Sequence, residues 1–245
     1  MPVRGGVISA PLINNPDGAF DIRRGTGRVS PTRFNPPSPT CTPGELFPAG
    51  ISRRATPFVS RFIRRDDSRQ ALIYVDGACL DNGQAKPKAG WAFVFKPEAA
   101  GTAPDRLAVS GRLEKNGPFG DEHGQTSNRA ELRAVLGALR FRHWEGEGFT
   151  TLVIATDSEY VAEGATTWAR GWVRNGWRTS TGAYVKNKDL WEALLGEVER
   201  WDSWGLKIQF WRIPRTLNIV ADGAAKLVAG EGDVEEYRET SGVLV

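Results

Sequence analysis

The sequence predicts an α/β domain that follows an irregular N-terminal arm. Residues 1–68 are repeatedly interrupted by Pro, Gly, Ser and Thr and show no sustained helical or strand period, which is typical of irregular structure. From residue 71 onward, short runs of β-branched and aromatic residues alternate with segments of helical periodicity, as expected for strands and helices in turn. We therefore expect an Arg- and Pro-rich arm over 1–68, a folded domain over 69–230 and a tail over 231–245.

The predicted elements alternate in a defined order. Three apolar runs at 71–75, 90–95 and 106–113 predict an antiparallel meander. Leu132, Val135, Leu136 and Leu139 then follow the spacing of one helix face. A buried strand at 151–156 follows that helix and should therefore run parallel to the first strand, beside it. The remaining predictions are a short helix after Asp157, a helix from Asp189 to about Trp204, a strand at 206–213 and a last helix at 218–229.

The composition fits a globular protein that works inside a cell. The 245-residue chain is 40% hydrophobic and contains nine Trp, enough for a substantial core. It has no apolar run approaching the roughly 18–20 residues that span a bilayer, and its start lacks the apolar core of a secretion signal. We therefore expect no membrane contact and a location in the nucleus, the cytoplasm or the mitochondrion, where Cys41 and Cys79 stay reduced.

The arm carries most of the positive charge. Residues 1–65 contain ten Arg against three acids, a balance of +7, which leaves −4 for the rest of a chain whose net charge is +3. Basic segments contact nucleic acid in some proteins and are simply solvated in others. The sequence leaves both interpretations of the arm open.

Four acids occupy positions that favour a metal site. Asp76 ends the first strand, Asp157 follows the strand at 151–156, Glu131 lies on the first turn of a helix and Asp222 near the start of the last helix. Each has a simpler explanation when taken alone. Asp76 with Gly77 reads as a turn, and Glu131 with Asn128 as a capping box. If the fold brings all four together, they make a site for a divalent ion.

The segment 164–188 has the composition of a nucleic-acid contact. It contains five Lys or Arg, three Trp and no acid, and interleaved cations and aromatics favour nucleic acid over a solvated face. The five cations are Arg170, Arg174, Arg178, Lys186 and Lys188.

These motifs together resemble those of the ribonuclease H type 1 family. The resemblance covers about residues 69–229. It is carried by four motifs, which are 75–79 with Asn82-Gly83, 126–132, 155–161, and Val220-Ala221-Asp222. Further matches are Trp168, Trp172, 175–177 and 185–190. Four motifs in the right order are specific, whereas any one alone is weak. The resemblance implies a ribonuclease H-like fold, a mixed five-stranded sheet flanked by helices.

The resemblance also implies an endonuclease that hydrolyses the RNA strand of RNA–DNA hybrids with two Mg²⁺ ions, with Mn²⁺ as an alternative ion. Asp76 would bridge the two ions, Asp222 would hold the ion that activates water, and Glu131 with Asp157 would hold the ion on the leaving-group side. Hard oxygen ligands suit Mg²⁺, and a pair of ions clamps the attacking and leaving oxygens of an in-line displacement. A monomer acting on a hybrid is expected.

The same resemblance assigns the substrate contacts. Asn82, Ser127 and Asn128 would read 2′-hydroxyls and bases from the minor groove. Tyr160, Trp168 and Trp172 would line the channel for the DNA strand, and Thr126 with Asn187 would form its phosphate pocket. The five cations of 164–188 would form a basic protrusion.

The sequence departs from the family pattern in three ways. The turn 214–218 lacks the His that the family usually carries there, and an Arg that often completes the phosphate pocket aligns with Gly124, which leaves His123 or Arg129 as substitutes. Residues 1–68 do not resemble the N-terminal hybrid-binding domain of many eukaryotic members. The alternative is therefore a catalytically weak or inactive module that binds hybrids or double-stranded RNA, derived from a retroelement. Retention of all four acids favours the enzyme, because clustered like charges are costly without a function.

Overall fold

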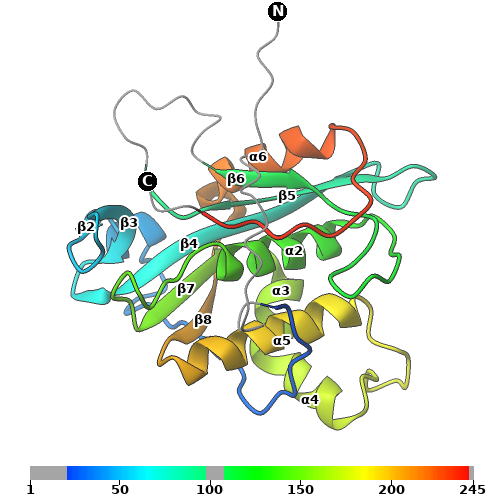
Figure 1. Ribbon diagram of the computed structural model, residues 1–245, viewed down its shortest axis with the longest axis horizontal. Helices are drawn as coiled ribbons and strands as arrows, with labels where there is room; N and C mark the ends of the chain where they lie inside the picture. Colours follow the sequence, from blue (N-terminus) through cyan, green and yellow to red (C-terminus); the bar gives the residue numbers. More distant parts are fainter. Residues whose placement is uncertain (1–20, 98–107, 243–245) are drawn as a thin grey trace, which may run out of the picture.

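In the computed structural model, which describes residues 21–97 and 108–242, the chain forms one eight-stranded mixed sheet with helices on both faces (Figure 1). The strands are β1 (Thr32–Arg33), β2 (Ala49–Ser52), β3 (Val59–Arg64), β4 (Asp67–Leu80), β5 (Lys88–Val94), β6 (Val109–Arg112), β7 (Thr151–Thr156) and β8 (Lys207–Arg212). The helices are α1 (Pro43–Leu46), α2 (Ser127–Arg140), α3 (Glu159–Glu163), the π-helix η2 (Gly164–Trp168), α4 (Ala169–Arg174), α5 (Lys188–Ser203), the 3₁₀ turn η3 (Arg215–Leu217) and α6 (Ile219–Ala229).

The predicted mixed sheet is confirmed, but the predicted number of five strands is wrong, because the described residues form eight. Strands β4, β5 and β6 form the antiparallel meander, although residues 106 and 107 of the third predicted strand lie outside the described residues. Strand β7 runs parallel to β4, and β8 runs parallel to β7. Because Tyr74 pairs with Ala155, Asp76 and Asp157, each two residues further on, lie near each other where the pairing of β4 with β7 ends. The prediction that Asp76 ends its strand is wrong, because β4 continues to Leu80 and Asp76 pairs with Ala92 of β5.

The two faces of the sheet are covered by different helices. On one face, α2 and α5 bury side chains such as Ile73 and Val75 in the largest core cluster. On the other face, α6 packs against β4 and β5, where Ala225 meets Ala78 and Ala92. Because strand side chains alternate between faces, β4 supplies both cores, and its Asp76 lies on the same side as Ala78 and α6.

The arm is part of the sheet, so the prediction of a largely irregular segment over 1–68 is wrong for residues 32–68. Strand β3 pairs with the first half of β4, β2 extends it, and β1 adds a parallel edge to β8. The predicted boundary at 68 falls inside β4. Residues 1–20 of the predicted arm lie outside the described residues.

The arm is ordered because it covers apolar surface that the helices leave open. Phe34 and Phe47 are buried against Trp211, with ring centroids 4.9 and 6.3 Å from the indole. These rings complete a second cluster with Leu72 and Val153 on the face that α6 covers only in part. This burial, which depends on partners about 180 residues away, offsets the conformational entropy of ordering a Pro-rich segment.

The two ends of the described chain also pack on the domain. Before β1, the backbone at Gly25 lies directly on α5. A Cβ added at Gly25 would lie 2.3 Å from the Gly196 nitrogen. After α6, Val234 bridges to Glu114 and the Arg238 carbonyl accepts from Arg133, so the predicted tail follows the sheet edge and α2 (Figure 1). Within the described residues, no helix is long and apolar enough to cross a membrane.

Candidate active site

Four elements bring the predicted acids to one end of the sheet. Asp76 lies on β4, Asp157 directly follows β7, Glu131 is on α2 and Asp222 is on α6. The charges of the other three acids all act on the Asp76 carboxyl. The structure therefore gathers the four acids that the sequence singled out.

Asp76 is the most deeply placed of the four. Its side chain is buried, and Oδ1 accepts a hydrogen bond from the Gly77 backbone N–H at 2.8 Å. Its Oδ2 is buried and has no hydrogen-bond partner among the described residues. Burial raises the pKa of Asp76 to about 7, and the negative charge of Asp157 adds to this effect, because both disfavour the ionised form.

Gly77 allows Glu131 to approach. A Cβ at Gly77 would lie 2.1 Å from the Glu131 nitrogen, so only glycine permits the first turn of α2 to rest on β4. Glu131 accepts a hydrogen bond from Ser158 Oγ at 2.5 Å, and burial raises its pKa above the usual range. The capping-box interpretation of Glu131 is wrong, because Thr126 caps α2 by accepting from the Arg129 N–H.

Asp157 is held by Asn218, a buried residue of the turn before α6. The Asn218 amide donates to Asp157 Oδ1 at 2.8 Å and to the Val75 carbonyl at 2.9 Å. This single side chain therefore ties the end of β7 to β4 and to the turn. Its role was not predicted from the sequence, because an isolated Asn in a turn is most simply explained by turn preference.

Asp222 is engaged by two cations of the protein. Arg215 donates to Oδ1 at 2.9 Å and Lys226 to Oδ2 at 2.6 Å. Burial opposes ionisation, but the hydrogen bonds from Lys226 and Arg215 outweigh it and lower the pKa of Asp222. Arg215 also lies 3.7 Å from Asp157 Oδ2. The turn lacks the His that the family usually carries, and the contact of Arg215 with two of the acids was not predicted from the sequence.

The donor set fits a divalent ion, although the acids are not arranged as a ready-made cage. Within 21–97 and 108–242, no three His, Cys, Asp or Glu side chains have the geometry of a metal site, and Asp157 and Asp222 face Asn218, Arg215 and Lys226. The unpartnered Oδ2 of buried Asp76 and the mutual repulsion of the acids are features that a hard cation would relieve. The chemistry of the four side chains therefore fits such an ion.

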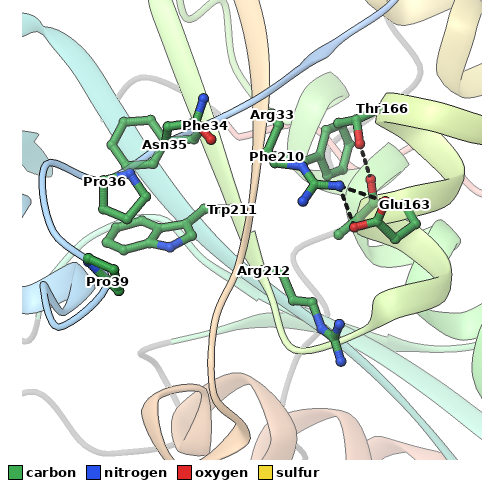
Figure 2. A pocket seen from close by; sticks show the side chains of 11 residues that line it. Arg33, Phe34, Asn35, Pro36, Pro39, Glu163, Thr166, Phe210, Trp211 and Arg212 are labelled. Atoms are coloured by element: carbon green, nitrogen blue, oxygen red, sulfur yellow. Dashed lines mark hydrogen bonds and ion pairs between the residues drawn. The ribbon is translucent and has the colours of Figure 1, made fainter.

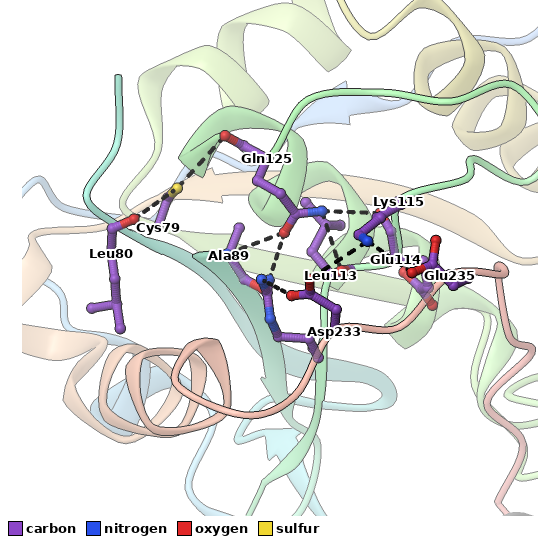
Figure 3. A network of polar contacts seen from close by, with 10 residues as sticks. Cys79, Leu80, Ala89, Leu113, Glu114, Lys115, Gln125, Asp233 and Glu235 are labelled. Carbon is purple, nitrogen blue, oxygen red and sulfur yellow. Dashed lines mark hydrogen bonds and ion pairs between the residues drawn. The ribbon is translucent and has the colours of Figure 1, made fainter. Parts of the chain in front are cut away.

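The predicted minor-groove residues lie around the start of α2. Asn82 donates to Ser127 Oγ at 3.4 Å, so the β4–β5 loop meets the helix start, and Asn128 is exposed beside them. Gln125 fixes this region (Figure 3), since its amide accepts from Arg112 and the Ala89 N–H and donates to the Leu113 and Glu114 carbonyls. Arg112 also pairs with Asp233, which links the C-terminal tail to the same network.

The residues predicted to form a phosphate pocket lie at two helix starts. Thr126 caps α2 and Asn187 precedes α5, and a buried ion pair between Arg129 and Asp189 at 2.6 Å holds the two starts together. His123 lies 3.3 Å from the same Asp189 carboxylate. His123 and Arg129, the two candidate substitutes for the Arg that often aligns with Gly124 in the family, therefore both contact Asp189.

Tyr160, Trp168 and Trp172 form one aromatic row. Ring centroids are 6.5 Å apart for Tyr160 and Trp168 and 5.9 Å apart for Trp168 and Trp172. Trp172 also packs edge-on against buried Trp191 at 5.4 Å, whereas Trp168 is 38% exposed. Tyr160 accepts hydrogen bonds from Asn187 and Trp191, so the row joins the predicted phosphate pocket.

The five predicted cations of the protrusion are all exposed. Arg178 folds over the Tyr184 ring and Lys188 pairs with Glu192 at 3.4 Å. Arg170, Arg174 and Lys186 are on the same segment, and no acid of 164–188 competes for them. The protrusion therefore presents positive charge to its surroundings.

A groove of about 440 Å³ lies elsewhere, along the outer side of β8 (Figure 2). It is lined by Phe34 and Trp211 and by Arg33, which forms an ion pair with Glu163 at 2.5 Å. None of the four clustered acids or predicted substrate contacts lines it. The groove is a product of the way the arm docks and not part of the acidic site.

Comparison with known proteins agrees with this description. The family model described as RNase H matches residues 68–204. The chain is 41% identical to the ribonuclease H of Treponema pallidum over 128 residues, which are 50% of this chain and 69% of that protein. It is 32% identical to human ribonuclease H1 over 161 residues, 66% of this chain and 49% of that protein. The crystal structure of LC9-RNase H1, a type 1 RNase H with the type 2 active-site motif, superposes with a TM-score of 0.47 at 26% identity, covering 66% of this chain and 72% of that one.

Proposed function

The chain belongs to the RNase H family, and on that premise we propose that it is an endonuclease that hydrolyses the RNA strand of RNA–DNA hybrids. The observation that carries this proposal is the convergence of Asp76, Glu131, Asp157 and Asp222 on one sheet edge, with an unpartnered buried oxygen on Asp76. The family generally uses divalent metal ions, and we propose Mg²⁺ as the ion, with Mn²⁺ as a substitute.

Each acid has a proposed role. Asp76 would bridge two ions, Asp222 would hold the ion on the side of the attacking water, and Glu131 with Asp157 would hold the ion on the leaving-group side. Bound ions would stabilise the charge that develops on the attacking and leaving oxygens. Asn218 keeps Asp157 in place through its hydrogen bond, and Ser158 does the same for Glu131.

The proposed substrate contacts surround this edge. Asn82, Ser127 and Asn128 would read the 2′-hydroxyls of the RNA strand, which are the group that distinguishes RNA from DNA. Thr126 and Asn187 would hold a phosphate of the DNA strand, and the row formed by Tyr160, Trp168 and Trp172 would face its sugars. The exposed cations of the protrusion would add sequence-independent affinity for the duplex.

A non-catalytic module for hybrids or double-stranded RNA is the second candidate. The specific observation in its favour is that Arg215 occupies the turn where the family usually carries His. Against it, a binding module gains nothing from the burial and the neighbouring negative charges that raise the pKa of Asp76.

A cleavage assay separates the two candidates. A labelled RNA–DNA hybrid is incubated with the full chain in Mg²⁺ and in chelator, beside Asp76→Asn. We expect cleavage in Mg²⁺ alone, loss of more than about a hundredfold in Asp76→Asn, and unchanged binding of the hybrid by that variant. Binding without cleavage by the unaltered chain would favour the non-catalytic module, and substantial cleavage by Asp76→Asn would show that the metal assignment is wrong.

A further inference from the structure

Arg215 lies where a cation is needed between two of the acids. Its guanidinium is 2.9 Å from Asp222 Oδ1, and its Nε is 3.7 Å from Asp157 Oδ2. Lys226 takes the other oxygen of Asp222 at 2.6 Å. Both oxygens of Asp222 and both oxygens of Asp157 are therefore engaged by protein groups, since Asn218 holds Asp157 Oδ1.

The backbone under Arg215 is fixed, whereas its side chain is not. The turn is closed by hydrogen bonds from the Leu217 N–H to the Pro214 carbonyl and from the Asn218 N–H to the Arg215 carbonyl, and buried Asn218 anchors it to β4. The Arg215 side chain, in contrast, is 68% exposed. It can swing into solvent without opening a cavity or moving the turn.

We propose that Arg215 is a displaceable counter-ion that competes with the metal for Asp157 and Asp222 and so sets the metal concentration at which the site fills. This inference rests on the proposed function of the four acids. A multivalent ion binds the carboxylates more strongly than an exposed guanidinium, whose pairs are worth little in water, so the metal wins at sufficient concentration. At low metal concentration Arg215 reduces the repulsion between the acids and keeps them close together.

The matched control is Arg212, which is 53% exposed at the same sheet edge and pairs with Glu159 at 2.9 Å. Its removal also lowers the positive charge near the site by one, but it has no contact with the four acids. A difference between Arg215→Ala and Arg212→Ala therefore reports direct competition and not general electrostatics.

Calorimetric titration with Mg²⁺ alone, on the full chain without substrate, tests the proposal. We expect Arg215→Ala to bind Mg²⁺ about two- to tenfold more tightly than the unaltered chain, since the ion pairs of Asp157 and Asp222 with the exposed Arg215 guanidinium no longer have to be broken. Arg215→Lys should lie close to the unaltered chain, and Arg212→Ala should change the affinity by less than about half of the effect of Arg215→Ala.

Melting curves give a second readout. In chelator, Arg215→Ala should melt at a lower temperature than Arg212→Ala, because the acids lose their counter-ion. Addition of Mg²⁺ should raise the melting temperature of Arg215→Ala by more than it raises that of Arg212→Ala or of the unaltered chain. Equal or weaker Mg²⁺ binding by Arg215→Ala would overturn the inference, provided that Asp76→Asn abolishes binding. If Asp76→Asn titrates like the unaltered chain, the proposed metal site itself is wrong.

Discussion

At the scale of single residues, Asp76 makes the stability of the protein depend on pH. Its folded-state pKa is about 7, against an ordinary value of 3.8. Between these two pH values the folded state holds a proton that the unfolded state has released, so the free energy of unfolding falls as pH rises from about 4 to about 7. Above pH 7 the folded state bears the full cost of a buried, repelled carboxylate.

Asp76→Asn should remove this pH dependence. In chelator, the variant should melt several degrees higher than the unaltered chain at pH 8, because a shift of about three pH units corresponds to at most ~4 kcal/mol. The difference should shrink towards zero at pH 4. Melting curves from pH 4 to 9 measure it, with Asp202→Asn at an exposed position as the control. A gap that stays constant over this range would contradict the burial argument.

Gly77 is predicted to be as sensitive to change as the acids themselves. Gly77→Ala places a Cβ 2.1 Å from the Glu131 nitrogen, so α2 has to shift and carry Glu131 away from Asp76. We expect cleavage to fall at least tenfold and stability to fall by ~1–3 kcal/mol. Gly223→Ala, beside Asp222 with no atom within 4 Å of the new Cβ, should keep its activity and gain up to ~1 kcal/mol of helix stability. Equal effects of both variants would show that the close approach is unimportant.

The acids could be predicted from the sequence, whereas the residues that hold them could not. Asp76 and Asp157 each follow an apolar run, and parallel pairing of the two runs places the two acids near each other, although the strand that bears Asp76 continues beyond it. Arg215 and Asn218 act through the exact path of a short turn and through side-chain orientation. Nothing in their local sequence specifies these, because Arg and Asn are ordinary residues in any exposed turn.

At the scale of elements, the two neighbouring Trp residues of the protrusion differ in their surroundings. The resemblance to the family implies that both Trp168 and Trp172 line the channel for the DNA strand. Trp172 packs against buried Trp191, and Trp168 remains partly exposed next to it. Trp172 therefore contributes to the packing of the protrusion, whereas Trp168 contributes to its surface.

The two Trp residues should consequently differ when replaced by Ala. Trp168→Ala should raise KM for hybrids severalfold and change the melting temperature by no more than about 2 °C, whereas Trp172→Ala should raise KM and also lower the melting temperature by several degrees. Leu227→Ala, an exposed change on α6, serves as the control. An unchanged KM in Trp168→Ala would remove it from the proposed substrate contacts.

The regular helices and strands could be predicted from the hydrophobic periodicity of the sequence, whereas the irregular elements could not. The predicted helices at 189–204 and 218–229 differ from α5 and α6 by one residue at the ends, and the strand at 206–213 contains β8. The π-helix η2 has no such signal, because Gly164–Trp168 lacks any pattern that distinguishes it from the α-helices on either side.

At the scale of the whole molecule, the arm belongs to the core. The sequence indicates this indirectly, because β7 and β8 carry apolar residues on both of their faces. The predicted helices alone do not cover all of these residues. Trp211 and Val153 face away from the large core, and strands buried on both faces need a partner on each. Truncation of residues 1–68 is thus expected to unfold the domain and not merely to weaken binding.

Point substitutions test this placement more precisely. Phe34→Ala removes a buried ring that packs on Trp211 at 4.9 Å and should cost ~3–5 kcal/mol of the free energy of unfolding, measured by denaturant titration. Phe58→Ala, in the same arm but 65% exposed, should cost less than ~1 kcal/mol. Similar small losses for both would mean that the arm contributes little to the folded state.

The π turn between α3 and α4 has a genetic consequence. An i→i+5 turn holds one residue more than an α-helical path of the same course, and each residue of an α-helix turns the chain by about 100°. Loss of a single codon within η2, such as that of Thr167, would therefore restore an α-helical path and leave the face that bears Trp172 turned towards Trp191. The same loss within α4, which holds no extra residue, would rotate the later side chains of that helix by about 100°. The direction in which the basic protrusion points is thus expected to tolerate a one-residue deletion in η2 better than one in the helix that follows it.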